Sequence, residues 1–410
     1  MRYFDFIQTN KRFLSFGFLL TLFSSIGQTF FISLFNPYIQ SDLSLSNTEL
    51  GMIYSMATLC SAALMVWIGP KIDDCDLRQY TLWVGVGLSL ACLAMAISSS
   101  AFMLFICYVL LRLTGQGLMC HIATVSMARY FNIGRGQAIS IAALGHPVGQ
   151  IVFPVLIAFA FSYFKWHVIW WILAILTPVV VLPVCLWLLR YHHERHAHFL
   201  LTNLDKSDHS QSNKAHTVFY DWRFYAIAIG SLATGFINTG IFFQYHAIIL
   251  SKGWSFELYS LSFIAYAIGN IVGSIIIGVL IDRYKAINML MFYLIPLCVG
   301  LAFLNQFNWH WALFLFMLGA GISQGASSVI IAAVWSELYG GAYLGTIRSW
   351  VSVLQVISTG IAPVFFSKLI DYGHGVHMLL LLCITFVCLC MVLLGSVRFS
   401  LKIQETELAP

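Results

Sequence analysis

Twelve long apolar segments constrain the fold of this chain more than any other feature of its sequence. An α-helix needs about twenty apolar residues to cross the roughly 30 Å hydrocarbon core of a bilayer. A transmembrane barrel would instead need segments of about ten residues with alternating hydrophobicity. We therefore expect an all-α integral membrane protein, with spans near residues 14–39, 50–70, 80–99, 102–127, 138–161, 168–190, 224–250, 259–280, 288–306, 310–335, 346–369 and 377–398.

The scarcity of charge excludes other classes of protein. Only 9% of the 410 residues are charged, whereas a typical soluble domain carries about 25%. The formal net charge of +5 is scattered and forms no basic stripe, so nucleic-acid binding is excluded as well. The ten cysteines are mostly spread singly through apolar stretches, and we expect neither a disulfide framework nor a metal site.

Lysine and arginine are distributed unevenly between the predicted loops. With the N-terminus inside, seventeen of the 21 basic residues lie in inner segments and three in outer loops, and Arg112 lies within a span. Loops rich in Lys and Arg stay on the cytoplasmic side of a membrane. We therefore expect both termini in the cytoplasm and a multi-pass protein of the cell membrane, in particular the bacterial inner membrane.

The two halves of the chain are related by a duplication. Identical residues recur at a constant offset of 209, at corresponding helix ends and helix breakers: Gly69 and Gly278, Asp73 and Asp282, Tyr130 and Tyr339, Gly136 and Gly345, Ser140 and Ser349, Pro154 and Pro363. A recurrence without gaps indicates internal repeats. We expect an N-terminal six-helix bundle (1–190), a cytoplasmic His-rich linker (191–221), a C-terminal six-helix bundle (222–398) and a cytoplasmic tail (399–410).

This layout resembles that of the major facilitator superfamily. The loop after the eighth span reads Gly278-Val-Leu-Ile-Asp282-Arg283 and is similar to the superfamily's G-x-L-x-D-R motif. The loop after the second span keeps Gly69, Asp73 and one downstream arginine, but it lacks the second glycine and the arginine next to the aspartate. The resemblance implies two pseudo-symmetric bundles that work by alternating access around a central site.

A further resemblance concerns one branch of the superfamily. The fourth span carries Arg112-Leu-Thr-Gly115-Gln-Gly117, which is similar to the superfamily's R-x-x-x-G pattern. The segments that look most like the monocarboxylate and oxalate/formate transporters are Ala128–Phe131, Arg135–Ala138, Glu337–Gly340 and Gly345–Arg348. This chain lacks the basic residue that some members of the branch hold in the eighth or eleventh span.

Arg112 is the most informative single residue. It lies about ten residues into the fourth span, hence near mid-membrane at about 1.5 Å per residue. A charge at that depth costs about 2.5–3.5 kcal/mol and is expected to face a water-filled cavity. No acidic residue is predicted at similar depth, so we expect Arg112 to bind an anion or to take part in coupling. The alternative is an arginine held by backbone carbonyls and by the amide of Gln116, one turn along.

Other polar and aromatic residues recur at helical spacing on the spans that would line the central cavity. The candidates for substrate contact are Gln116, Gln28, Phe31, Phe35, Asn238, Tyr245, Tyr266, Asn270, Gln324 and Gln355. Interhelical hydrogen bonds, which are worth about 0.6 kcal/mol each on average, are the alternative explanation for any one of them.

Two groups of residues could couple or gate transport. His146, in the kinked Gly145–Gly149 stretch, could exchange a proton near neutral pH, or it could be a packed histidine bonded to a carbonyl freed by Pro147. By resemblance, charged residues on the cytoplasmic side would latch the two bundles together, and these are Asp73, Arg78, Arg129, Arg135, Asp282, Arg283, Glu337 and Arg348. Loop charges that only orient the chain are the alternative.

These features predict a secondary transporter of a small organic anion of the carboxylate type, coupled to the movement of a proton. We expect a monomer in the lipid bilayer that requires no cofactor and no nucleic acid. No Walker motif is present, so ATP does not drive this chain directly. The alternatives are an exporter of drugs or of a larger metabolite such as a siderophore, and a sensor that signals through the His-rich linker. No set of catalytic groups stands out, so an enzyme is not expected.

Overall fold

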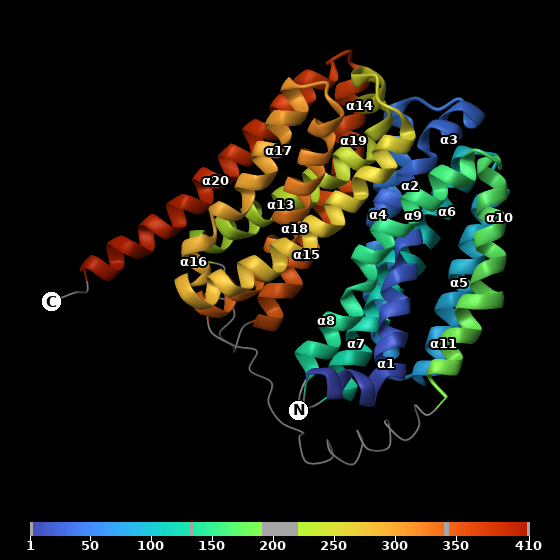
Figure 1. The fold of residues 1–410 in the computed structure, drawn as a ribbon, viewed down its shortest axis with the longest axis horizontal. Helices are drawn as coiled ribbons and strands as arrows, with labels where there is room; N and C mark the ends of the chain where they lie inside the picture. The colour runs from blue at the N-terminus through green and yellow to red at the C-terminus, as the bar shows by residue number, and fades with distance from the viewer. Residues whose placement is uncertain (1–2, 132–133, 191–219, 340–343, 408–410) are drawn as a thin grey trace. The chain divides into compact units, whose positions relative to one another are not determined.

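The computed structural model describes residues 3–131, 134–190, 220–339 and 344–407. Every regular element in these ranges is a helix, and the chain divides into two compact units, residues 1–209 and 210–410 (Figure 1). Residues 191–219, which hold most of the predicted His-rich linker, lie outside the described ranges. The prediction of an all-α fold is confirmed.

The helices of the described residues account for the predicted spans. Ten are long and apolar enough to cross a membrane, and a bent pair, Asp5–Gly27 with Thr29–Leu43, forms an eleventh span. The remaining predicted span, near 288–306, corresponds to a shorter apolar helix, Phe292–Gln306. It is short because a separate turn of helix, α16 (Ala286–Met289), precedes it.

The N-terminal unit holds the first six spans. Its helices are α1 (Tyr3–Phe23), α2 (Thr29–Ile32), α3 (Asn36–Leu43), α4 (Asn47–Ile68), α5 (Leu77–Ala96), α6 (Ala101–Leu111), α7 (Cys120–Tyr130), α8 (Arg135–Ala143), α9 (Gly145–Phe161), α10 (Trp166–Leu176) and α11 (Leu182–Leu188). Several of its spans are irregular, among them the sixth, which holds a π-helical stretch, Thr177–Val181, between α10 and α11. The first bends by 48° and the fourth passes through a π-helical stretch, Arg112–Met119, between α6 and α7.

The irregular stretches of the first and fourth spans cross each other closely. A Cβ added to Gly27 would clash with the carbonyl oxygen of Leu111 and lie 2.5 Å from the amide nitrogen of Gln116. A Cβ on Gly115 would lie 2.8 Å from the Cα of Gly27. Only glycine fits at both positions, because the two backbones are in contact there. The crossing fixes the first span against the beginning of the π-helical stretch.

The C-terminal unit holds the other six spans in longer and straighter helices. These are α13 (Trp222–Phe243), α14 (Tyr245–Lys252), α15 (Phe256–Tyr284), α16, α17 (Ile295–Gln306), α18 (His310–Tyr339), α19 (Leu344–Asp371) and α20 (Val376–Glu407). The predicted span 224–250 is divided at Gln244, whose backbone leaves the helical conformation and whose side-chain amide donates a hydrogen bond to Ser367.

Close packing of α15 on α18 dominates this unit. Each helix carries two glycines four residues apart, Gly269 and Gly273 on α15 and Gly321 and Gly325 on α18, and a Cβ on any of them would clash with a backbone oxygen of the other helix. Small residues at this spacing let the backbones of membrane helices touch. The eighth and tenth spans are therefore joined without a layer of side chains between them.

Candidate functional site

Arg112 is buried in the N-terminal unit among side chains from the first, second and fourth spans. Its side chain is 5% exposed. Its Nη1 donates a hydrogen bond to Thr29 Oγ1 at 3.3 Å, and the hydroxyl of Tyr54 donates to the same oxygen at 2.8 Å. The guanidinium carbon lies 5.4 Å from the centre of the Tyr54 ring, within the range of a cation–π contact. Arg112, Thr29 and Tyr54 form a compact cluster, which we call the arginine cluster.

The Nε of the Arg112 guanidinium has no hydrogen-bond partner among the described residues. Among the described residues, Arg112 forms no ion pair and its Nε, although buried, makes no hydrogen bond. Burial of a charge without a counter-ion is costly, and each unpaired buried donor adds to the cost. Thr29 satisfies Nη1, and Nε is left without an acceptor among the described residues. A guanidinium edge presents two parallel N–H groups that match the two oxygens of a carboxylate.

The local backbone explains how these residues meet. Gln28 has an extended conformation (φ −84°, ψ 151°), which ends the first half of the span and begins α2 at Thr29. On the fourth span, the π-helical stretch begins at Arg112 itself. Such stretches widen a helix locally and are frequent at functional sites. Gln28 and Gln116 are half-buried beside this crossing, and the Gln116 Oε1 has no hydrogen-bond partner.

A second polar cluster lies in the C-terminal unit. The side-chain nitrogen of Asn238, on α13, donates to Tyr266 on α15 at 3.4 Å and to Gln324 on α18 at 3.3 Å. The Oδ1 of Asn238 is buried and has no partner. Asn238 stands 209 positions after Thr29, so the same repeat position carries the central polar residue of each unit. We call Asn238, Tyr266 and Gln324 the asparagine cluster.

The other predicted contact residues lie elsewhere in their units. Phe31 and Phe35 are fully buried and pack against Trp170, with ring centres 5.7 and 4.8 Å away, in the core of the N-terminal unit. Tyr245 stacks on Tyr259 at 4.5 Å. Asn270 is half-buried beside the glycine crossing of α15 and α18, and Gln355 is exposed on α19. The structure therefore groups only some of the predicted residues with Arg112 or Asn238.

His146 begins the second part of the fifth span. The span is interrupted at Leu144, between α8 and α9, and Gly145 packs against the backbone of α1 at Phe18. The His146 ring is half-buried and meets Phe30 edge to face, with centres 6.1 Å apart. The interruption three residues before Pro147 agrees with the predicted kink, and it turns the imidazole towards the first span.

The predicted gate residues make contacts inside their own units. Asp73 pairs with Arg129, which also donates to the carbonyl of Ile72 at 3.2 Å. Glu337 accepts hydrogen bonds from the backbone N–H groups of Ala286 and Ile287, at 2.8 and 3.1 Å, and so caps α16.

The remaining gate residues are at the surface. The guanidinium of Arg283 lies over the Tyr284 ring, and Arg78, Arg135 and Asp282 are exposed. The side chain of Arg348 lies outside the described residues. Contacts between these groups across the two units remain a prediction.

Sequence reasoning missed Thr29 and Tyr54, although both contact Arg112 or its partner. A threonine and a tyrosine in apolar spans carry no signal of their own. The repeat offered one, since Thr29 and the predicted Asn238 stand at the same position of the two halves. Among the described residues, no group of three His, Cys, Asp or Glu side chains could hold a metal ion.

Comparisons with solved structures identify the fold. A bacterial homolog of the human lysosomal transporter Spinster, in its inward-facing and unoccupied conformation, aligns with a TM-score of 0.71 at 14% identity, over 95% of this chain and 97% of that one. The nucleoside transporter NupG aligns with a TM-score of 0.73 at 13% identity, over 97% of this chain and 99% of that one. No curated protein matches the sequence.

The family follows from the sequence comparison. A family model of the Major Facilitator Superfamily matches residues 17–363, most of the chain. The model describes the superfamily as a whole and does not separate its branches. The superfamily consists of membrane transporters, which agrees with the apolar helices and with the paired units and excludes an enzyme. The chain belongs to the Major Facilitator Superfamily and is a multi-pass membrane transporter.

Proposed function

We propose that this protein is a secondary transporter that carries a small organic anion of the carboxylate type by alternating access. The observation that carries the proposal is the unpaired Nε edge of Arg112, a buried cation without an acidic partner among the described residues. A carboxylate bound side-on would supply both the missing counter-charge and the missing acceptors. Gln28 and Gln116, which are half-buried on the same two spans, would hydrogen-bond the rest of a small substrate.

The orientation and the location are part of the same proposal. Both termini would lie in the cytoplasm of a bacterial cell, and the monomer would act in the inner membrane. The Arg and Lys distribution between the loops supports this orientation. The similarity of the Ala128–Phe131 and Arg135–Ala138 segments supports a place near the monocarboxylate and oxalate/formate branch.

A ligand screen on the purified protein tests the substrate class. A ligand that binds only the folded state at about 100 times its Kd stabilises it by about 2.7 kcal/mol, so a thermal-shift assay detects it. The set would contain small carboxylates, amino acids, siderophores and nucleosides. We expect shifts with one or more carboxylates. Shifts with neutral compounds alone would contradict the proposal.

Arg112 variants link any hit to the site. Hydrogen bonds to charged groups are worth about 1.5–3 kcal/mol, so Arg112→Gln should weaken binding by at least about tenfold. Arg112→Lys should retain part of the affinity, because it keeps the charge but not the two-pronged geometry. Lys71→Gln, which removes an exposed inner-loop charge, is the matched control. Equal affinity of Arg112→Gln and the unmodified protein would refute the assignment.

Proton coupling is proposed to involve His146. An imidazole can change its charge between pH 5 and 8, and the kink before α9 sets this ring beside the first span. Uptake into proteoliposomes under an imposed pH gradient should be stimulated in the unmodified protein and lose that stimulation in His146→Asn. Uptake by the unmodified protein that does not depend on the pH gradient would contradict coupling. Movement of the substrate only in the direction opposite to that of the protons would favour the exporter alternative.

A further inference from the structure

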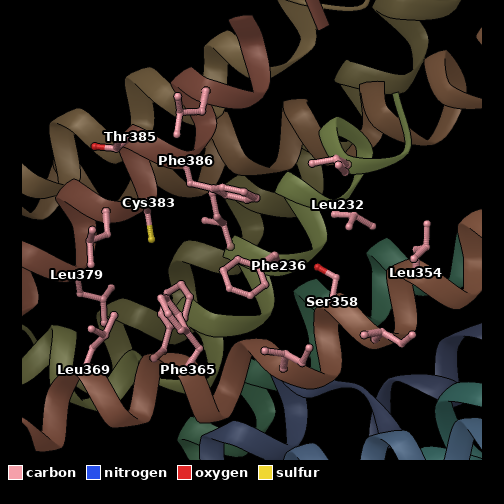
Figure 2. A pocket seen from close by; sticks show the side chains of 17 residues that line it. Leu232, Phe236, Leu354, Ser358, Phe365, Leu369, Leu379, Cys383, Thr385 and Phe386 are labelled. Carbon is pink, nitrogen blue, oxygen red and sulfur yellow. The ribbon is translucent and has the colours of Figure 1, made fainter. Parts of the chain in front are cut away.

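A long apolar groove runs along the C-terminal unit and is lined by no residue of either polar cluster. It lies between α13, α19 and α20 and has a volume of about 570 Å³. Figure 2 shows side chains from these three helices pointing into one space, with Phe236 of α13 between Phe365 of α19 and Phe386 of α20. The ring centres of Phe236 lie 5.8 Å from Phe365 and 5.7 Å from Phe386.

The lining excludes a polar ligand. Of the 17 residues in Figure 2, only Ser358 and Thr385 carry hydroxyl groups. The Thr385 hydroxyl donates to the carbonyl of Leu381 in its own helix and is therefore already used. Water does not fill apolar cavities that offer it no hydrogen-bond partners. The groove is therefore suited to a hydrocarbon chain.

The groove is closed on one side and open on the other. Its floor is formed by buried residues, among them Ile237, Phe366 and Cys383. Its rim is exposed along the middle of the membrane-spanning helices, with Ile361 45% and Leu389 62% exposed. In a membrane protein such a rim faces acyl chains.

The groove is long enough to hold one acyl chain. On α19 the lining residues run from Leu354 to Leu369, fifteen residue steps or about 22 Å. A single leaflet contributes about half of the roughly 30 Å hydrocarbon core, so a chain of one leaflet can lie along most of the groove. At one end, next to Leu369, stands the exposed Lys368, whose ammonium group can pair with a headgroup phosphate at the membrane surface.

We propose that this groove holds one acyl chain of a membrane phospholipid as a resident ligand, with the phosphate of that lipid at Lys368. The bilayer is as apolar as the groove, so the preference arises from packing against the aromatic floor. A lipid elsewhere on the surface lacks these contacts. The site is separate from the arginine cluster, and its occupancy does not depend on which substrate the protein carries.

Photo-crosslinking tests the proposal in the full-length protein. The protein would be reconstituted in vesicles that contain a phosphatidylglycerol with a diazirine on its acyl chain, illuminated and mapped by peptide mass spectrometry. We expect about tenfold more label on the groove segments of α19 and α20 than on the α15 segment around Ile275, which is 62% exposed and lies outside the groove. Equal labelling of the two faces would overturn the proposal.

Variants and lipid retention give a second, independent readout. Native mass spectrometry after detergent exchange should detect one retained phospholipid in the unmodified protein and in the control Ile275→Trp. Ser358→Trp fills the groove and should reduce retention by about tenfold. If that variant is not monodisperse, Thr385→Trp, on the α20 side, replaces it.

The contact with Lys368 tests whether the bound acyl chain belongs to a phospholipid. Lys368→Gln should reduce retention of phosphatidylglycerol and leave labelling by a diazirine-bearing diacylglycerol, which has no charged headgroup, unchanged. Retention of diacylglycerol but not phospholipid would refute the phospholipid assignment, as would retention unchanged in both Ser358→Trp and Thr385→Trp. Carboxylate binding at Arg112 is measured separately, so either proposal can fail without the other.

Discussion

The crossing of Gly27 with the fourth span offers the sharpest test of how the arginine cluster is built. In Gly27→Ala the new Cβ would lie 2.5 Å from the amide nitrogen of Gln116, whereas ordinary contacts begin at 3.4 Å. The two backbones would have to separate by about 1 Å, and overpacking of this kind costs about 1–3 kcal/mol. The shift would also move Thr29, two residues on, relative to Arg112.

The measurements follow from these numbers. A loss of 1 kcal/mol lowers the melting temperature by about 2–4 °C in domains of 150–250 residues, so we expect a decrease of several degrees in a thermal-shift assay. The variant should also lose the stabilisation by the carboxylate hit. Gly136→Ala is the matched control, because nothing lies within 4 Å of its added Cβ and alanine is favoured over glycine in a helix. A Gly27→Ala protein with unchanged melting temperature and ligand response would refute the close crossing.

Three further substitutions test the remaining contacts. Thr29→Val removes the oxygen shared by Arg112 and Tyr54 and should destabilise the protein by about 1–3 kcal/mol. Thr29→Ser keeps the oxygen and should retain most of the stability. Equal melting temperatures for the two variants would contradict the shared hydrogen bond. Asn238→Ala removes both hydrogen bonds and should destabilise the C-terminal unit by about 0.6–1.7 kcal/mol in thermal unfolding. Tyr266→Phe removes one of them and should have a smaller effect. A larger effect of Tyr266→Phe would show that Asn238 is not the centre of the asparagine cluster. Glu337→Ala uncaps α16 and should cost about 0.5–2 kcal/mol, with faster hydrogen exchange at Ala286 and Ile287; unchanged exchange there would exclude the cap.

Much of the fold could be predicted because hydrophobic length is a strong signal in a bilayer. The apolar runs located the spans, and the depth of Arg112 identified the one base inside a span. The interruptions were less predictable. Nothing in the residues around Gln28 marks an extended backbone, and a π-helical stretch has no sequence code that separates it from an ordinary helix. The bend in the first span and the π-helical stretch in the fourth span each depend on packing against the other, and a single sequence does not show how the two spans pack.

The site was predicted only in part, for a related reason. Polarity alone selected Asn238, Tyr266 and Gln324 as candidates for substrate contact, and the structure joins the three by hydrogen bonds, because amides in apolar spans need partners. Aromatic residues are ambiguous, since a phenylalanine fits a cavity wall and a core equally well. Phe31 and Phe35 pack in the core around Trp170, one ring perpendicular to the indole and the other tilted against it.

The glycine-matched crossing of α15 and α18 has a mechanical consequence. At these four glycines no side chain separates the two backbones, so no rotamer change there can absorb a displacement of one helix against the other. The first span of the N-terminal unit is likewise held backbone against backbone, by Gly27 and Gly115 beside its bend at Gln28. Each unit thus holds a crossing at which any displacement must move whole helices, because glycines bring the backbones into direct contact.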